Sequence, residues 1–329
     1  RTKTYNNHIT LKKFMATYKE IHGVKIQYRE SDATAIEGDV WYNASTAKLK
    51  MYAALGSWAS GGNLTTARTT TGAGTQTAAI SAGGYTTAYV AIVESYDGSS
   101  WTEIADINTA RGRAVAMGTQ TAALHVGGES SIHAIAEKWN GTSWTEVGDL
   151  NTARYWPGGA GTNTAALVFG GTSPSAPTTP SNESYDGTSW TEVANLNDGR
   201  YSNGGGGTQT SAITAGGASA PVVGNTETWD GSSWTEVNNL NTARYGLEVV
   251  AADSTSALAF GGTPPVKDET EEWDGTSWTE VADLSTARVE VMGAGTQPSA
   301  LAIGGNSGSV TNATEEWSFT ASVETVAFD

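Results

Sequence analysis

The chain has 329 residues, of which 38% are hydrophobic and 40 are glycine, so it can bury a substantial core built from short strands and tight turns. Its net charge of −16 disfavours binding to nucleic acid phosphates or anionic lipids, and no apolar stretch approaches the roughly 20 residues that span a bilayer. The absence of Cys excludes disulfides, thiolate nucleophiles and zinc–thiolate sites.

The first 37 residues differ from the rest of the chain in charge and in pattern. Residues 1–30 carry +5, so the other 299 residues carry −21. Apolar residues recur at helical spacing at Leu11, Phe14, Tyr18 and Ile21. Gly23 can end that helix, and residues 24–29 alternate like a strand. We expect residues 1–37 to form a docking arm for an acidic partner protein; the alternative is a solvated helix that packs on the rest of the chain.

Residues 53–329 are built from one repeated unit. Six tryptophans are separated by 43 to 46 residues, at positions 58, 101, 144, 190, 234 and 278. Ten residues after each Trp stands an Arg, namely Arg68, Arg111, Arg154, Arg200, Arg244 and Arg288. A Gly-Gly pair begins 15 to 17 residues after each Arg. Self-similarity at this period indicates six stacked or radially arranged units.

One unit, residues 155–196, illustrates the expected local structure. Residues 164–171 are small and apolar and end in Gly-Gly, as a buried inner strand does when it enters a turn with positive φ. Residues 183–193 contain two strand-like runs around Asp186-Gly187, which favours a tight hairpin. A two-residue turn would pair Glu183 with Trp190 and place Tyr185 and Trp190 on one face. A further strand before the Gly-Gly strand gives about four strands per unit, as in a propeller blade.

The two ends of the repeat region are incomplete in complementary ways. The last unit has Gly304-Gly305 and Trp317 but lacks the following Trp-Thr-Glu strand, whereas the first has a strand around Trp58 and no Gly-Gly strand before it. We expect the ring to close by pairing the N-terminal strand with the last blade, which removes exposed sheet edges. The alternative is that residues 318–328 complete the last blade.

The order Gly-Gly, spacer, Glu-x-Tyr/Trp-Asp-Gly, Trp and Arg resembles the kelch repeat over about residues 48–318. The junction GDVWYNASTAKLKMY, residues 38–52, resembles a hairpin phrase common in bacteriophage tail and fibre proteins, and WNGTSWTE, residues 139–146, resembles repeats of phage virion proteins. These resemblances imply an all-β fold, a six-bladed kelch-type β-propeller with a small N-terminal α/β docking arm. They also imply a non-enzymatic virion protein of a phage tail or fibre, located in the virion or outside the cell. The alternatives are a secreted carbohydrate-acting enzyme and a bacterial surface adhesin or filament subunit.

No catalytic motif and no cofactor site is evident, so we predict neither a catalytic residue nor a cofactor. His125 and His133 flank a Gly-Gly turn, but no third ligand stands at a telling spacing, and no metal is expected. For the six repeated arginines, Arg68, Arg111, Arg154, Arg200, Arg244 and Arg288, the main interpretation is ion pairing within the frame. The alternative is a ring that binds an anionic sugar or a carboxylate.

The segments between Gly-Gly and the next Glu vary in every unit and should emerge on one side of the propeller. Such variation on a constant frame is typical of binding surfaces, although relaxed loops without a partner would look the same. The longest segment is residues 172–182. The binding residues predicted in these loops are Tyr85, Tyr89, His133, Pro174, Pro177, Pro180 and Lys267. We expect them to contact a host glycan, a receptor or a neighbouring virion protein, while the arm contacts other virion or surface proteins.

Overall fold

The structure is a computed structural model that describes residues 27–29 and 40–325. These residues form strands and turns and include no helix. The chain divides into two units, residues 57–318 and residues 1–56 together with 319–329. Most of the predicted arm, residues 1–37, lies outside the described residues, including the expected helix around Leu11–Ile21.

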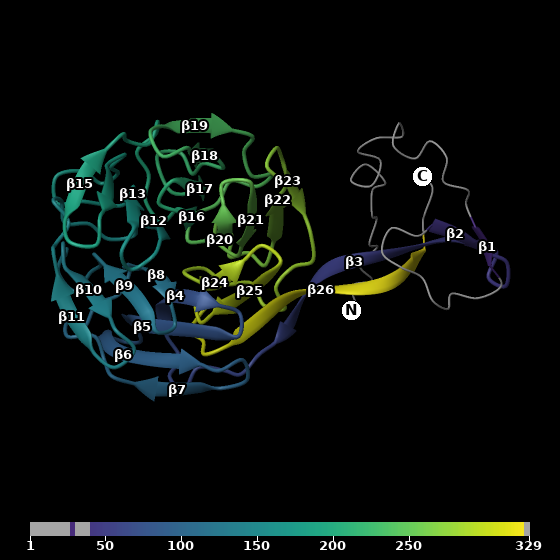
Figure 1. The fold of residues 1–329 in the computed structure, drawn as a ribbon, viewed down its shortest axis with the longest axis horizontal. Coiled ribbons are helices and arrows are strands. Elements are labelled where there is room, and N and C mark those ends of the chain that lie inside the picture. Colours follow the sequence, from purple (N-terminus) through teal and green to yellow (C-terminus); the bar gives the residue numbers. More distant parts are fainter. Residues whose placement is uncertain (1–26, 30–39, 326–329) are drawn as a thin grey trace. The chain divides into compact units, whose positions relative to one another are not determined.

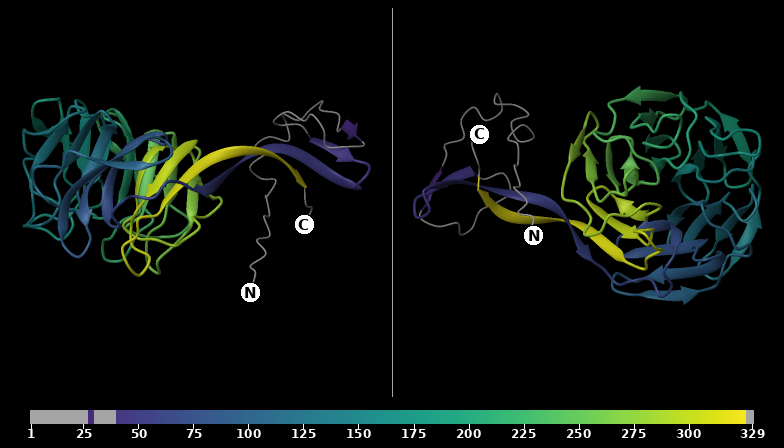
Figure 2. Two further views of the ribbon diagram at one scale, coloured as in Figure 1. Left: turned by 90° about the horizontal axis from the view of Figure 1, so that it is seen from below. Right: turned by 180° about the vertical axis from the view of Figure 1, so that it is seen from behind.

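Residues 57–318 form a six-bladed β-propeller, in which six sheets follow one another around a common centre (Figures 1 and 2). Blade one contains β4 (Thr69–Thr75), β5 (Ala78–Tyr85), β6 (Tyr89–Tyr96) and β7 (Trp101–Ile104). Blade two contains β8 (Val115–Thr119), β9 (Ala122–Val126), β10 (Ala136–Trp139) and β11 (Trp144–Val147). Blade three contains β12 (Gly158–Gly161), β13 (Ala166–Phe169), β14 (Asn182–Tyr185) and β15 (Trp190–Val193).

The other half of the ring follows the same plan. Blade four contains β16 (Gly204–Thr208), β17 (Ser211–Ala215), β18 (Thr226–Trp229) and β19 (Trp234–Val237). Blade five contains β20 (Glu248–Asp253), β21 (Ser256–Phe260), β22 (Thr270–Trp273) and β23 (Trp278–Glu280). Blade six contains β24 (Met292–Thr296), β25 (Ser299–Ile303), the first part of β26 (Thr314–Thr325) and the last part of β3 (Lys48–Ser60). The N-terminal strand β3 is therefore the outermost strand of blade six.

The second unit contains a hairpin of β2 (Val40–Asn43) with the first half of β3, and β1 (Gln27–Arg29) pairs with β2 in parallel. In the hairpin turn, the backbone N–H of Thr46 donates to Asn43 Oδ1 at 3.0 Å. The six-stranded sheet to which these strands belong has the order β1-β2-β3-β26-β25-β24.

The innermost strands of the blades are β4, β8, β12, β16, β20 and β24, and the strand that ends in Gly-Gly is the second from the centre. Several innermost strands are rich in glycine, because neighbouring blades approach closely there. A Cβ on Gly205 of β16 would lie 2.6 Å from the ring of Phe169 in blade three. Glycine at this position therefore lets two blades meet at the centre.

The predicted two-residue hairpin turn is wrong, because each residue pairs with a partner two positions further along the chain. Tyr185 pairs with Trp190 and Glu183 with Glu192, so the turn spans the four residues 186–189. The longer turn is stabilised by Asp186, whose Oδ1 accepts the N–H groups of Thr188 and Ser189 at 2.8 Å each. Since the register moves by two residues in total, Tyr185 and Trp190 still share a face, with ring centroids 4.8 Å apart.

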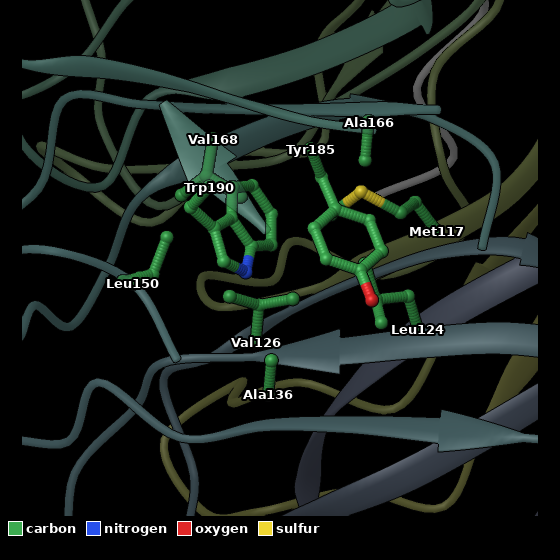
Figure 3. Close-up of a cluster of buried hydrophobic side chains, with 9 residues drawn as sticks. All are labelled: Met117, Leu124, Val126, Ala136, Leu150, Ala166, Val168, Tyr185 and Trp190. Atoms are coloured by element: carbon green, nitrogen blue, oxygen red, sulfur yellow. The ribbon is translucent and has the colours of Figure 1, made fainter. Parts of the chain in front are cut away.

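The repeated Trp of each unit is a wedge between blades. Trp190, only 6% exposed, packs with Tyr185 against Leu124, Val126 and other side chains of blade two (Figure 3). Its indole N–H donates to the carbonyl of Gly148, in the connector between the two blades, at 2.8 Å. Trp58 of β3 makes the corresponding contact for blade six, with its ring 5.0 Å from that of Phe260 in blade five. The wedge joins each blade to the one before it.

Each repeated Arg is a second joint between blades. The carbonyl of Arg200 accepts the N–H of Gly171 in blade three at 2.8 Å, while its guanidinium pairs with Glu227 in blade four at 2.7 Å. The first residue of the Gly-Gly pair touches the same carbonyl: Gly170 has φ 67°, and a Cβ there would lie 2.7 Å from the oxygen of Arg200. This contact explains why Arg and Gly-Gly recur together in the sequence.

The other five joints have the same partners. Their buried ion pairs are Arg68–Glu94, Arg111–Glu137, Arg154–Glu183, Arg244–Glu271 and Arg288–Glu315. The second carboxylate oxygen accepts a backbone N–H of the connector, as Glu137 does from Asn108 at 2.7 Å. The joint at Arg68 closes the ring, because its carbonyl accepts the N–H of Gly305 in blade six at 3.2 Å.

Replacing Trp190 with Ala should lower the free energy of unfolding by about 3 to 5 kcal/mol, since a buried wedge and its hydrogen bond are lost together. Urea denaturation measures this loss. Tyr85→Ala is the matched control, because Tyr85 is 39% exposed and should cost less than about 1 kcal/mol. A similarly small loss for Trp190→Ala would contradict the wedge.

Candidate functional site

One end of the propeller carries most of the variation between blades. It is formed by the loops between the second and third strands, residues 86–88, 127–135, 170–181, 216–225, 261–269 and 304–313, and by the connectors between blades. Antiparallel order places both kinds of segment at the same end of each sheet. Isolated bridges join them, for example Tyr155 to Thr172 and Tyr245 to Thr263. We call this end the loop face.

At the centre of the loop face, five blades each contribute the residue that stands two positions after the repeated Arg. These residues are Arg113, Trp156, Ser202, Gly246 and Glu290, and we call them the mouth ring. All five have φ between 52° and 64°. This left-handed conformation costs a non-glycine residue about 1 kcal/mol or more. Among the described residues, only Ala47 is a further non-glycine residue with positive φ.

Backbone hydrogen bonds run around the mouth ring from blade to blade. The N–H of Trp156 donates to the carbonyl of Arg113 at 2.7 Å, and that of Ser202 donates to Trp156 at 2.9 Å. Gly246 and Glu290 continue the series at 2.9 and 2.8 Å. The left-handed backbone therefore links five blades near the axis, and four of them present a different side chain there.

Blade one interrupts the mouth ring. Its segment from Arg68 to Gly83 spans 15 residues, one or two fewer than in the other blades, and it supplies no left-handed residue at this position of the described chain. Across this gap Arg113 Nε lies 3.9 Å from Glu290 Oε1. Where the series of backbone hydrogen bonds is interrupted at blade one, the side chains of Arg113 and Glu290 approach each other as an ion pair.

Arg113 is the centre of a polar network at the mouth. Its guanidinium pairs with Glu129 of the blade-two loop and lies 4.2 Å from the centroid of the Trp156 ring. The hydroxyl of Tyr89, from blade one, donates to Glu129 at 2.7 Å. Burial and this hydrogen bond raise the pKa of Tyr89 to about 12. The network connects blades one, two, three and six.

Aromatic side chains extend from the mouth along the loop face. Trp156 stacks on Tyr201 with ring centroids 5.5 Å apart and also contacts Tyr155 at 5.1 Å. Tyr201 is followed by Tyr245 at 6.5 Å. All four are partly exposed, so blades three to five offer an aromatic arc to a ligand.

Below the mouth ring lies a small cavity of about 50 Å³. Its lining includes Val115, Trp156, Glu248, Glu290 and Met292. Glu248 is the first residue of β20, and at the corresponding positions the other innermost strands have Thr71, Val115, Gly158, Gly204 and Met292. Glu248 is therefore the one charged residue among these six equivalent positions of the innermost strands.

Two of the predicted loop residues come together at the mouth. Tyr85 and Tyr89 have ring centroids 5.2 Å apart, and Tyr89 joins the network of Glu129 and Arg113. Each of the other predicted residues lies in the loop of its own blade. His133 is hydrogen-bonded to Ser130 through Nε2 at 2.9 Å, and Lys267 pairs with Glu269 at 2.7 Å.

The three prolines of the blade-three loop differ in their surroundings. Pro174 and Pro177 are exposed, whereas the carbonyl of Pro180 accepts the N–H of Leu196 at 3.0 Å and belongs to the frame. The segment 172–182 expected to be a free loop also includes Asn182, which is the first residue of β14. The part available to a partner is accordingly residues 174–178.

The six repeated arginines line no open surface. Each side chain is fully buried and already holds a glutamate. The alternative prediction is a ring of these arginines that binds an anion. None of the six guanidinium groups is exposed, so none is accessible to such a ligand.

His125 lies in β9 and is fully buried, with neither ring nitrogen hydrogen-bonded. Burial, with the charge of Arg111, lowers its pKa well below the usual range. In the described ranges 27–29 and 40–325 no group of three or more His, Asp or Glu is placed to hold a metal ion. The same residues include no helix long and apolar enough to cross a membrane.

Sequence reasoning missed the mouth ring, although a signal was present. Between the invariant Arg and the Gly-Gly strand, the second residue is different in every blade, and it includes Arg113, Trp156 and Glu290. Attention to variation within the fixed spacing, in addition to variation in loop length, would have identified these positions.

Replacing Ser202 with Gly should leave the free energy of unfolding unchanged or raise it by up to about 1 kcal/mol, because relief of the left-handed strain offsets the entropy of glycine in the unfolded chain. Chemical denaturation measures the change. Ser57→Gly, at an exposed position of β3, is the control and should lower the stability by about 0.5 to 1 kcal/mol. Equal losses in both variants would show that Ser202 is not strained.

Stability should fall as the pH drops below about 6.5, where a histidine of the unfolded chain takes up a proton that folded His125 does not. The pKa of His125 is lowered in the folded state, so through this group the free energy of unfolding does not depend on pH above the pKa of the unfolded chain. Below that pH the free energy of unfolding decreases, by at most about 1.4 kcal/mol per pH unit. In His125→Val, which copies Val168 of blade three, this slope should be smaller. Denaturation at several pH values tests the difference, and parallel curves would refute it.

No protein-family model matches this chain, and no curated protein is significantly similar to it. The structure itself establishes the fold, an all-β six-bladed propeller.

Proposed function

We propose that this chain is a non-enzymatic binding and structural protein of a bacteriophage tail or fibre, built on kelch-type repeats. The phage class rests on the sequence resemblances of residues 38–52 and 139–146. The binding role rests on the geometry of the loop face. In this proposal the protein functions in the virion or outside the cell, and the N-terminal arm attaches it to other virion or surface proteins.

The observation that carries the binding role is the set of four non-glycine residues in left-handed conformation at the mouth. Gly246 occupies the same position in blade five, so the backbone there accepts glycine without strain. Arg113, Trp156, Ser202 and Glu290 keep a conformation that glycine would adopt at lower cost. Strain is retained at four equivalent positions that carry four different side chains. This supports a role for these side chains in binding a partner.

The loops around the mouth support the same function. The frame of Trp wedges and Arg joints is common to the blades, while the loops differ in length and composition. Exposed Tyr85, Pro174 and Pro177 present apolar and conformationally restricted groups, which lose little entropy on binding. A host glycan, a receptor or a neighbouring virion protein is the partner that we propose for this face.

Replacing residues 174–178 with a Gly/Ser segment of equal length, together with Tyr85→Ser, should reduce the adsorption of particles to host cells or the affinity for a neighbouring protein by at least about tenfold. The melting temperature should change little, because residues 174–178 lie outside the strands and Tyr85, at the end of β5, is exposed. The control variant carries Thr142→Ser and Thr188→Ser in exposed turns at the opposite end of the propeller and should bind normally. Full adsorption after replacement of the loop tips in all six blades would overturn the proposal.

A further inference from the structure

The cavity below the mouth ring has an unusual combination of walls. One part is apolar and is formed by Val115, Met292 and the indole of Trp156. The lining also includes the polar residues Ser202 and Asn203 and the acidic residues Glu248 and Glu290. A ligand that fits these walls has a hydrocarbon segment and a polar end that is complementary to carboxylates.

The volume limits the shape of such a ligand. About 50 Å³ holds roughly three or four water molecules, which is far too little for a sugar ring. Glycines at positions 158 and 205 line the cavity, so the space lies close to the backbone of the inner strands. A narrow, linear group can enter the cavity, whereas a wider molecule has to remain on the loop face.

The charge balance favours a cation. Glu129, Glu248 and Glu290 surround the mouth, and Arg113 is the cation that faces them from the mouth ring. Arg113 is engaged by Glu129 and lies near Glu290. In the described part of the chain no cation pairs with Glu248, and its Cγ lies close to Gly293 of β24, where a Cβ would be 2.8 Å away. The carboxyl group of Glu248 is thus left with no charged partner.

We propose that this cavity binds a primary alkylammonium group, whose nitrogen pairs with Glu248 while its methylene chain lies against Trp156, Met292 and Val115. The proposal rests on the proposed function, because it names the ligand class of the same mouth. The source of the group is either a free linear amine or a lysine side chain of a partner protein, since both have the same chemistry at the carboxyl group.

The electrostatics of the empty site agree with this assignment. Burial raises the pKa of Glu248 well above its usual range. Burial and the charge of Glu129 raise that of Glu290, against the effect of Arg113. Both carboxyl groups would be stabilised in their ionised form by an incoming positive charge. The net charge of −21 on residues 31–329 attracts cations towards the protein.

The test uses the full chain and isothermal titration calorimetry with n-butylammonium chloride at constant ionic strength. The wild-type protein should bind it, and Glu248→Gln should weaken binding at least about tenfold, because the ammonium loses its charged partner. The peptide acetyl-Gly-Lys-Gly-amide distinguishes the sources: binding of both probes assigns the site to a lysine side chain of a partner, and binding of butylammonium alone assigns it to a free amine.

Two controls make the outcome specific. The neutral isostere n-butanol should not bind, and Glu103→Gln, which removes an exposed carboxylate of β7, should bind butylammonium like the wild type. Glu248→Gln should fold with an unchanged or higher melting temperature at pH 8, because a neutral amide replaces a partly desolvated carboxyl group that has no charged partner.

Absence of butylammonium binding, equal binding of n-butanol, or unchanged binding in Glu248→Gln would overturn the ammonium site. Those results leave the proposed function intact if the loop variants still lose adsorption. Conversely, amine binding that depends on Glu248, with full adsorption of every loop variant, would retain the ammonium site and reject the proposed role of the loop face in attachment.

Discussion

The propeller depends on the buried Arg joint between successive blades. In each joint, the carbonyl of the Arg is held by the Gly-Gly turn of one blade, and the guanidinium by a glutamate of the next. A buried ion pair is expensive to desolvate and becomes favourable only when its remaining hydrogen-bonding groups are satisfied. Here the glutamate is satisfied, because its second oxygen accepts a backbone N–H of the connector and so fixes the chain that carries the Arg. The guanidinium is less complete, since Nε of Arg200, Arg244 and Arg288 has no hydrogen-bond partner among the described residues. The same joint between Gly305 and Arg68 closes the ring.

Because the joints and the Trp wedges fix the blades, the residues just beyond each Arg are free to differ. The chain has positive φ there in five blades, and four of these residues bring a side chain to the mouth. Blade one lacks the extra residue, so the mouth ring has a seam between Glu290 and Arg113. The asymmetry of the site thus follows from a single length difference in an otherwise regular repeat.

The repeat period, the Gly-Gly pairs and the short strand patterns were sufficient to predict a six-bladed all-β propeller, and the structure confirms it. Turn geometry was less predictable, since the choice between a two-residue and a four-residue hairpin depends on where the carboxylate of Asp186 finds donors. Of the predicted site residues, Tyr85 and Tyr89 meet near the mouth. Arg113, Trp156 and Glu290 come from distant repeats, and their convergence depends on the closure of the ring, which residue spacing alone does not reveal.

The mouth combines two features that lower stability. Four side chains hold a left-handed backbone, and Glu248, which is only partly exposed, has no charged partner in the described part of the chain. Neither feature is required by the fold, because Gly246 shows that the first can be avoided and the uncharged residues at the level of Glu248 show that the second can. Both occur within one small opening, while the joints and wedges around it are regular. A frame with redundant joints tolerates such local losses, and their concentration at the axis distinguishes this opening from the rest of the propeller and supports the binding role that we propose for it.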